Sequence, residues 1–202
     1  MRELLPKVRQ SAMRIVWLSL IATVLSVGLF VSSASATVMK YADVDRLIEI
    51  SDIIIHAEVV EQKTYFDTEQ DRVVTDTTFG VNRAFWGKVG EKVTIQQWGG
   101  TYQGTTHYIP GDARFEVGEE VVVFLHKGKD VVALSALGQA KFSVEKTNEG
   151  KLVSRDLSDI TFMLEQNGQQ KLGHLPGETR SFVSFVAELE ALVQGIKGGT
   201  NE

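Results

Sequence analysis

Residues Val73–Trp86 read VVTDTTFGVNRAFW, and this stretch decides the fold class. Its β-branched residues and its two-residue alternation predict a strand. Four side chains then share one face of that strand: Thr75, Thr77, Phe79 and Val81. The strand is long, and it contains the small residues Gly80 and Ala84. Those two features predict a bulge or a sharp bend, as small barrels use at their corners.

The segments on both sides also alternate with a period of two. Upstream, Ile53–Val59 predicts a strand that carries His56 and Glu58 on one face, and the polar segment Gln62–Arg72 predicts a hairpin tip. Downstream, the apolar run Val121–His126 predicts a central buried strand. Further short strands are predicted on its two sides: Lys92–Trp98, Val131–Leu137, Lys141–Lys146, Leu152–Arg155 and Asp159–Leu164. Glu165–Glu178 is rich in Gly and Gln and predicts a mobile loop.

Two helices flank these strands. Tyr41–Ser51 has apolar residues at helical spacing after a capping Asp43. Residues 179–197 carry a one-sided apolar stripe, which predicts an amphipathic helix packed on the sheet. The pattern therefore predicts a mainly β fold, a small antiparallel barrel or sandwich with a short N-terminal helix and an amphipathic C-terminal helix.

Residues 1–36 have the pattern of a signal peptide. Four basic residues precede the apolar run Ile15–Val31, and Ala34-Ser35-Ala36 matches a signal-peptidase site. Cleavage leaves residues 37–202 as one domain, exported to the periplasm or secreted. The alternative is an uncleaved membrane anchor, since the apolar run is at the lower limit for spanning a bilayer. Met13 is an alternative to Met1 as the true start.

The charge balance limits the class of partner. The chain carries 21 Lys and Arg against 26 Asp and Glu, and without the leader 17 basic and 25 acidic residues leave a net charge of −8. Such a surface disfavours nucleic acid and anionic lipid, because both bind clustered Lys and Arg. The chain contains no cysteine, which excludes disulfides, thiolate metal sites and a cysteine nucleophile.

Several short motifs resemble a known family. They are SDIIIHAEVV at Ser51–Val60, Phe85-Trp86-Gly87 after the long strand, Trp98-Gly99-Gly100, and the Pro110–Val121 segment PGDARFEVGEEV. Over about Ala42–Phe142 the chain resembles netrin-like and tissue-inhibitor-of-metalloproteinase-like OB barrels, and uncharacterised secreted bacterial proteins with the same opening. The resemblance implies an OB-like five-stranded Greek-key barrel with additions. The family's inhibitory contact with a target's zinc uses an N-terminal cysteine, so that mechanism does not carry over.

Motifs for catalysis are missing from the sequence. It has no H-E-x-x-H, no G-x-S-x-G and no P-loop. The four histidines are scattered, and the best metal-ligand set that folding could assemble is His56, Glu58 and His107. We therefore expect no cofactor and no metal. A secreted metal-dependent or serine hydrolase with a dispersed active site is the alternative to a non-catalytic protein.

The segment Gln96–Phe115, QQWGGTYQGTTHYIPGDARF, is the candidate binding loop. It gathers aromatic residues and a histidine between two predicted strands, and loops often carry function. The candidate ligand-binding residues are Trp98, Tyr102, His107 and Tyr108. Because OB barrels bind ligands across one sheet face and its flanking loops, we predict a non-catalytic module that binds a protein, peptide or glycan partner.

Overall fold

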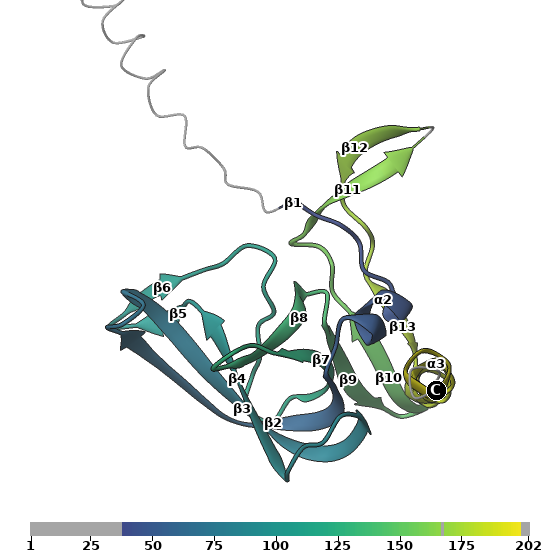
Figure 1. Cartoon of the computed structure of the whole chain (residues 1–202), viewed down its shortest axis with the longest axis horizontal. Coiled ribbons are helices and arrows are strands. Elements are labelled where there is room, and N and C mark those ends of the chain that lie inside the picture. Colours follow the sequence, from purple (N-terminus) through teal and green to yellow (C-terminus); the bar gives the residue numbers. More distant parts are fainter. Residues whose placement is uncertain (1–37, 167, 199–202) are drawn as a thin grey trace, which may run out of the picture. The chain divides into compact units, whose positions relative to one another are not determined.

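Two long strands form the centre of the fold. In the computed structural model, which describes residues 38–166 and 168–198, β2 (Ile53–Asp67) pairs antiparallel with β3 (Arg72–Trp86), as Figure 1 shows. The pairing register shifts three times, between Ile54 and Ile55, between His56 and Ala57, and between Val59 and Glu61. These irregularities lie opposite the part of β3 where the sequence predicts a bulge, and they bend the hairpin.

The strand order around this hairpin is a Greek key. β4 (Lys92–Trp98) pairs with β3, and β7 (Glu120–Lys127) returns to pair with β2, so the order is β7-β2-β3-β4. β8 (Val132–Gly138) pairs with the end of β7 and packs near β4, although no ladder joins β8 to β4 among the described residues. The fold is therefore mainly β and antiparallel, in keeping with the predicted barrel or sandwich.

The remaining strands extend the sheet or lie beside it. β9 (Lys141–Thr147), β10 (Gly150–Arg155) and β13 (Glu178–Ser181) continue the main sheet beyond β7. A second sheet contains β1 (Val38–Met39), β11 (Thr161–Gln166) and β12 (Gln169–Gly173), with β1 parallel to β11. A third is the small hairpin of β5 (Gly100–Tyr102) and β6 (Thr105–His107).

Both predicted helices are present. In α2 (Val44–Glu49) the carboxylate of Asp43 accepts a hydrogen bond of 2.8 Å from the backbone N–H of Arg46, which caps the first turn. α3 (Phe182–Gly198) packs against α2 and β10 and buries Phe185, Leu189 and Val193. The main core combines these apolar helix residues with the inward side chains of β2, β3, β7 and β9.

A buried arginine joins several of these elements. Arg155 on β10 donates to the carbonyl oxygens of Gln139, at 3.0 Å, and Ala42, at 2.5 Å, and to the Tyr41 hydroxyl at 3.4 Å. Tyr41 in turn donates to Glu178 on β13 at 2.7 Å, and the side chain of Gln139 accepts from the N–H of Ala42 at 2.8 Å. We call these five residues the Arg155 junction; it fixes the segment before α2 to the end of the main sheet.

Three sequence-based boundaries were wrong. The predicted hairpin tip Gln62–Arg72 shrinks to residues 68–71, because the ladder between β2 and β3 continues to the pair Asp67 and Arg72. The predicted loop Glu165–Glu178 contains β12, which pairs with β11. The helix predicted from residue 179 begins at Phe182, because residues 179–181 pair with β10 instead.

The predicted signal peptide, residues 1–36, lies outside the described residues. Within the described part of the chain, no helix is long and apolar enough to cross a membrane.

Candidate functional site: two hollows around Trp98

Two glycines shape the site by letting the chain turn sharply after β4. Gly99 and Gly100 have φ angles of 91° and 119°, a backbone conformation that residues other than glycine rarely adopt. A Cβ atom on Gly100 would lie 2.2 Å from Oγ1 of Thr75, and one on Gly99 would lie 2.3 Å from the carbonyl oxygen of His107. Only glycine therefore lets the β5–β6 hairpin lie directly against the β2–β3 hairpin.

The β5–β6 hairpin ends in a tight turn. Gln103 and Gly104 have φ angles of 49° and 78°, and the flanking residues Tyr102 and Thr105 pair across the hairpin. Two positive φ angles in a two-residue loop are the signature of a type I′ turn. The hairpin then carries Thr101 and Thr106 opposite each other, with their hydroxyls 2.9 Å apart.

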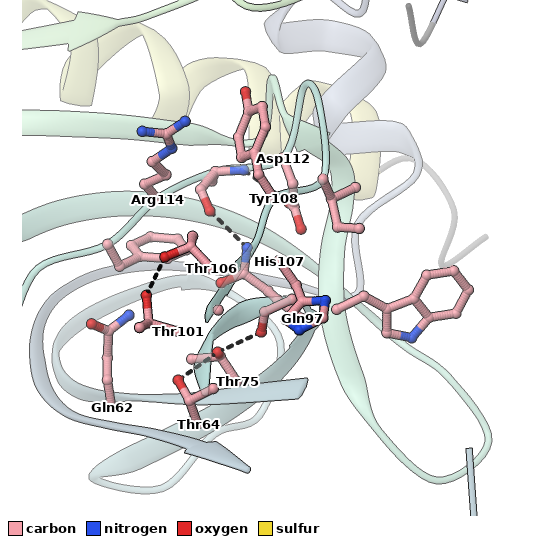
Figure 2. Close-up of a pocket in the computed structure, with 16 residues that line it drawn as sticks. Gln62, Thr64, Thr75, Gln97, Thr101, Thr106, His107, Tyr108, Asp112 and Arg114 are labelled. Atoms are coloured by element: carbon pink, nitrogen blue, oxygen red, sulfur yellow. Dashed lines mark hydrogen bonds between the residues drawn. The ribbon is translucent and has the colours of Figure 1, made fainter. Parts of the chain in front are cut away.

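The first hollow lies between this hairpin, β2–β3 and the segment that follows β6, and it has a volume of about 400 Å³. Figure 2 shows the polar side chains that surround it. The side chains that line it and bear on its chemistry are Gln62, Thr64, Thr75, Gln97, Trp98, Thr101, Thr106, His107, Tyr108, Asp112 and Arg114. Threonine and glutamine supply most of its polar groups, and Trp98, Ile109 and Phe115 add apolar surface, so the hollow is mixed in polarity and mostly uncharged.

The second hollow, of about 540 Å³, adjoins the first. It lies between β4 and β8, which no ladder joins in the described part of the chain, and residues of β7 and the β7–β8 turn complete its wall. Four residues line both hollows: Gln97, Trp98, Ile109 and Asp112. The two hollows therefore share one wall.

Trp98 stands in that shared wall with much of its ring open. It is 56% exposed, and the guanidinium carbon of Arg72 lies 4.1 Å from the ring centroid. The arginine covers one face of the indole by a cation–π contact. The exposed part of the ring is left to a ligand or to solvent.

The hydroxyl groups on the floor of the first hollow form a directed chain. Thr75 Oγ1 donates to the carbonyl oxygen of Gly99 at 2.8 Å, and it lies 2.9 Å from Thr64 Oγ1 (Figure 2). A hydroxyl has one hydrogen to donate, so Thr64 is the donor to Thr75. Gln97 donates through Nε2 to the carbonyl oxygen of Ala113 at 2.8 Å. Lone pairs of Thr64 and Thr75 and the Oε1 atom of Gln97 remain as acceptors.

Asp112 adds a carboxylate to this acceptor-rich wall. Burial raises the pKa of Asp112 above its ordinary value, opposed by hydrogen bonds from the Ala113 N–H and the Gln97 side chain. Desolvation therefore outweighs those two hydrogen bonds, and ionised Asp112 is less stable in this wall than in water. Perturbed carboxylates of this kind in a hollow are candidates for functional groups.

Tyr108 and Arg114 form the opposite rim. The Tyr108 hydroxyl donates to Asp159 at 2.6 Å, and the Arg114 guanidinium lies 4.4 Å from the Tyr108 ring centroid. The bond to Asp159 and desolvation raise the pKa of Tyr108, against the opposing effect of Arg114. The phenol is therefore held as a neutral donor and positioned from two sides.

Three of the four predicted site residues line the first hollow: Trp98, His107 and Tyr108. Tyr102 is not among the lining residues; its ring centroid lies 6.4 Å from that of Phe66. Tyr102 follows Thr101 in β5, and adjacent residues of a strand face opposite sides. Its contact with Phe66 ties the β5–β6 hairpin to the end of β2.

Other lining residues were missed by sequence reasoning. Thr64 lies inside the predicted hairpin tip, and Asp112 lies in what the sequence indicates is only a Pro-Gly-Asp turn. One signal was available for the threonines. Continued two-residue alternation through Thr64 and Thr75 places both on one face of a longer hairpin, as their pairing shows.

The metal-ligand set of the alternative hydrolase hypothesis does not assemble among the described residues. His56 Nε2 lies 2.5 Å from Glu120 Oε1, which also accepts from Lys151 Nζ at 2.5 Å, whereas His107 lines the first hollow. Among residues 38–166 and 168–198, no three His, Asp or Glu side chains are grouped so as to hold a metal ion. Burial raises the pKa of Glu120, but the bonds from Lys151 and His56 outweigh it and lower that pKa overall.

Comparison with known proteins gives no match: no protein-family model, no curated protein and no solved structure matches this chain. The resemblance to netrin-like barrels stays a prediction.

Proposed function

We propose that this protein is a non-catalytic binding module, exported from the cytoplasm, whose ligand occupies the two hollows around Trp98. The observation that carries the proposal is the position of Trp98. This large aromatic side chain is 56% exposed and lies in the wall shared by two adjoining hollows. Exposed aromatic rings in hollows supply large contact areas at low entropic cost and are enriched where proteins bind ligands.

The hydrogen bonding of the first hollow favours binding over catalysis. A nucleophilic hydroxyl is activated by a hydrogen bond to a neighbouring base. Here Thr75 donates to a backbone carbonyl, Thr64 donates to Thr75, and the Thr101 and Thr106 hydroxyls bond to each other. These hydroxyls are held as fixed polar contacts, which suits recognition of a ligand.

The two walls of the first hollow belong to different sheets. The wall formed by β2, β3 and β4 is part of the main sheet, whereas β5 and β6 form a separate two-stranded sheet among the described residues. Its contacts with the main sheet include the Tyr102–Phe66 packing. The main sheet holds the polar side chains of β2, β3 and β4 in place before the ligand arrives, which lowers the entropy cost of binding.

Protein-detected NMR tests this proposal. Isotope-labelled full-length protein is titrated with a mixed panel of mono- and disaccharides, capped dipeptides and small aromatic compounds. We expect the compounds that bind to shift the Trp98 indole and the backbone signals of Gln97 and Asp112. Trp98→Ala should abolish these shifts, whereas Leu172→Ala, which removes another exposed apolar side chain, should leave them unchanged.

Two results would contradict the proposal. One is a set of binding compounds whose shifts lie consistently away from the residues around Trp98. The other is turnover of nitrophenyl ester, nitrophenyl glycoside or peptide substrates by the purified protein. Turnover would support the hydrolase alternative.

A further inference from the structure

We infer that the ligand of the Trp98 site is a neutral oligosaccharide that crosses Trp98 and places sugar units in both hollows. This inference rests on the proposed binding function and specifies its ligand. It is carried by the open indole ring, by the balance of hydrogen-bonding groups, and by the two hollows on a shared wall.

The indole provides a stacking surface for a sugar ring. One face of Trp98 is covered by Arg72, at 4.1 Å from the ring centroid, and the side chain is still 56% exposed. The face of an aromatic ring carries negative charge, which attracts the weakly positive C–H groups on one face of a pyranose. The cation on the opposite face holds the ring in one orientation, so the stacking surface is formed before the sugar binds.

The groups around the ring match the hydroxyls of a sugar. The Thr64 and Thr75 lone pairs, Oε1 of Gln97 and the carboxylate of Asp112 are acceptors on one side of the first hollow. Each sugar hydroxyl can donate one hydrogen bond and accept others, so a sugar satisfies several such acceptors at once. The rim adds donors, since the Arg114 guanidinium and the Gln62 amide line the same hollow.

The charges favour a neutral ligand. The first hollow carries Asp112 on its wall and Arg114 on its rim, and Arg114 lies 4.0 Å from Asp159. Neither sign predominates, so neither a cationic nor an anionic ligand finds a complementary field.

The backbone of the first hollow offers little to an extended peptide. Peptides that add to a sheet form main-chain hydrogen bonds with an unpaired strand edge. On the floor of this hollow β3 lies between β2 and β4 and has no unpaired edge, and the Gly99 carbonyl already accepts from Thr75. The contacts available on this floor are therefore made by side chains, as sugars require.

The sizes of the hollows indicate more than one sugar unit. At about 400 and 540 Å³, each hollow lies within the range of small-ligand sites, roughly 300–1,000 Å³. Because Trp98 lines both hollows, an oligosaccharide with one unit stacked on Trp98 can place its neighbouring units in the two hollows. A hexasaccharide should therefore bind more tightly than the corresponding disaccharide.

Calorimetry and NMR with defined probes test the inference. The probes are neutral hexasaccharides of glucose, N-acetylglucosamine, mannose and galactose, their disaccharides, and a pool of capped, uncharged dodecapeptides. We expect at least one hexasaccharide to bind, roughly tenfold or more tightly than its disaccharide, and to lose roughly tenfold or more in affinity with Trp98→Ala. Leu172→Ala serves as the matched control and should bind like the unmodified protein.

The outcomes separate the two proposals. Peptide binding that shifts Trp98, without saccharide binding, would overturn the saccharide inference and retain the proposed function. Saccharide binding that survives Trp98→Ala would also overturn the inference, because the ligand would then lie elsewhere. Failure of every probe to bind would overturn both.

Discussion

The Arg155 junction and the Trp98 hollows are both rich in polar groups, but they use them in opposite ways. In the junction the guanidinium of Arg155 is fully buried and donates to two carbonyls and to Tyr41, and the side chain of Gln139 is also satisfied by backbone groups. In the hollows, Thr64, Gln97 and Asp112 retain acceptor capacity facing open space. Polar groups that satisfy one another stabilise the fold, whereas groups that keep unused capacity beside a hollow are available to a ligand.

The largest expected effect comes from removing Arg155, which tests whether the Arg155 junction stabilises the fold. Arg155→Ala leaves the carbonyls of Ala42 and Gln139 buried without their donor, and it opens a cavity beside Phe142. We expect the free energy of unfolding to fall by about 3–5 kcal/mol. Urea denaturation measures it, with Arg114→Ala as the control; Arg114 is exposed, and its loss should cost no more than about 1 kcal/mol. Similar losses in the two variants would contradict the distinction.

The glycines beside the hollow test whether its shape is also specified by packing. Gly100→Ala combines a positive φ with a Cβ atom 2.2 Å from Thr75 Oγ1, whereas Gly104→Ala has a positive φ and open space around it. We expect a loss of about 2–4 kcal/mol for Gly100→Ala and about 1 kcal/mol for Gly104→Ala. The difference, measured by urea denaturation, isolates the cost of the close approach. Equal losses would mean that the β5–β6 hairpin moves away at little cost.

A carboxylate with strong partners should stabilise the fold at neutral pH. Hydrogen bonds from Lys151 and His56 hold the pKa of Glu120 below its ordinary value of 4.5, despite partial burial. A carboxyl group with a lowered folded-state pKa stabilises the protein above the unfolded-state pKa, and loses that effect as the pH falls through the folded value. We expect Glu120→Gln to cost about 1 kcal/mol at pH 7, and the difference should fade as the pH falls below 4.5 and through the lowered folded-state pKa of Glu120. Urea denaturation at several pH values measures this, and a difference that persists in acid would point to a packing effect.

Much of the fold could be predicted because its strands carry their own pattern. The β-branched alternation of Val73–Trp86 and the apolar run Val121–His126 are local signals, and both strands are present. β12 was missed because Gln169–Gly173 has no apolar alternation; it is a strand only because β11 pairs with it. β13 was missed for a similar reason, since its residues suit a helix start until β10 supplies a partner.

Sequence reasoning could identify only those site residues whose types are unusual in a loop. Trp98, His107 and Tyr108 stood out as aromatic and imidazole side chains in one glycine-rich loop, and they line one hollow. Thr64 and Asp112 are common residue types for turns, and nothing local distinguishes them. Their place in the hollow depends on contacts between β2, β3 and the segment after β6, which form only in the folded chain.

Asp112 provides the smallest predicted effect and the sharpest contrast with Glu120. Burial raises the pKa of Asp112, so its ionised form is less stable in the folded protein than in the unfolded chain. The linkage has the opposite sign from that of Glu120: ionisation of Asp112 destabilises the fold once the pH rises above the ordinary Asp pKa of 3.8.

Asp112→Asn keeps an oxygen that can accept from the Ala113 N–H, and we expect it to raise the free energy of unfolding by roughly 0.5 kcal/mol at pH 7. The gain should fade as the pH falls toward 3.8, whereas the affinity for the ligand at pH 7 should fall because an acceptor is weakened. A substitution that stabilises the fold and weakens binding identifies a group kept for recognition; a loss of stability with Asp112→Asn would instead place Asp112 with the structural groups of the Arg155 junction.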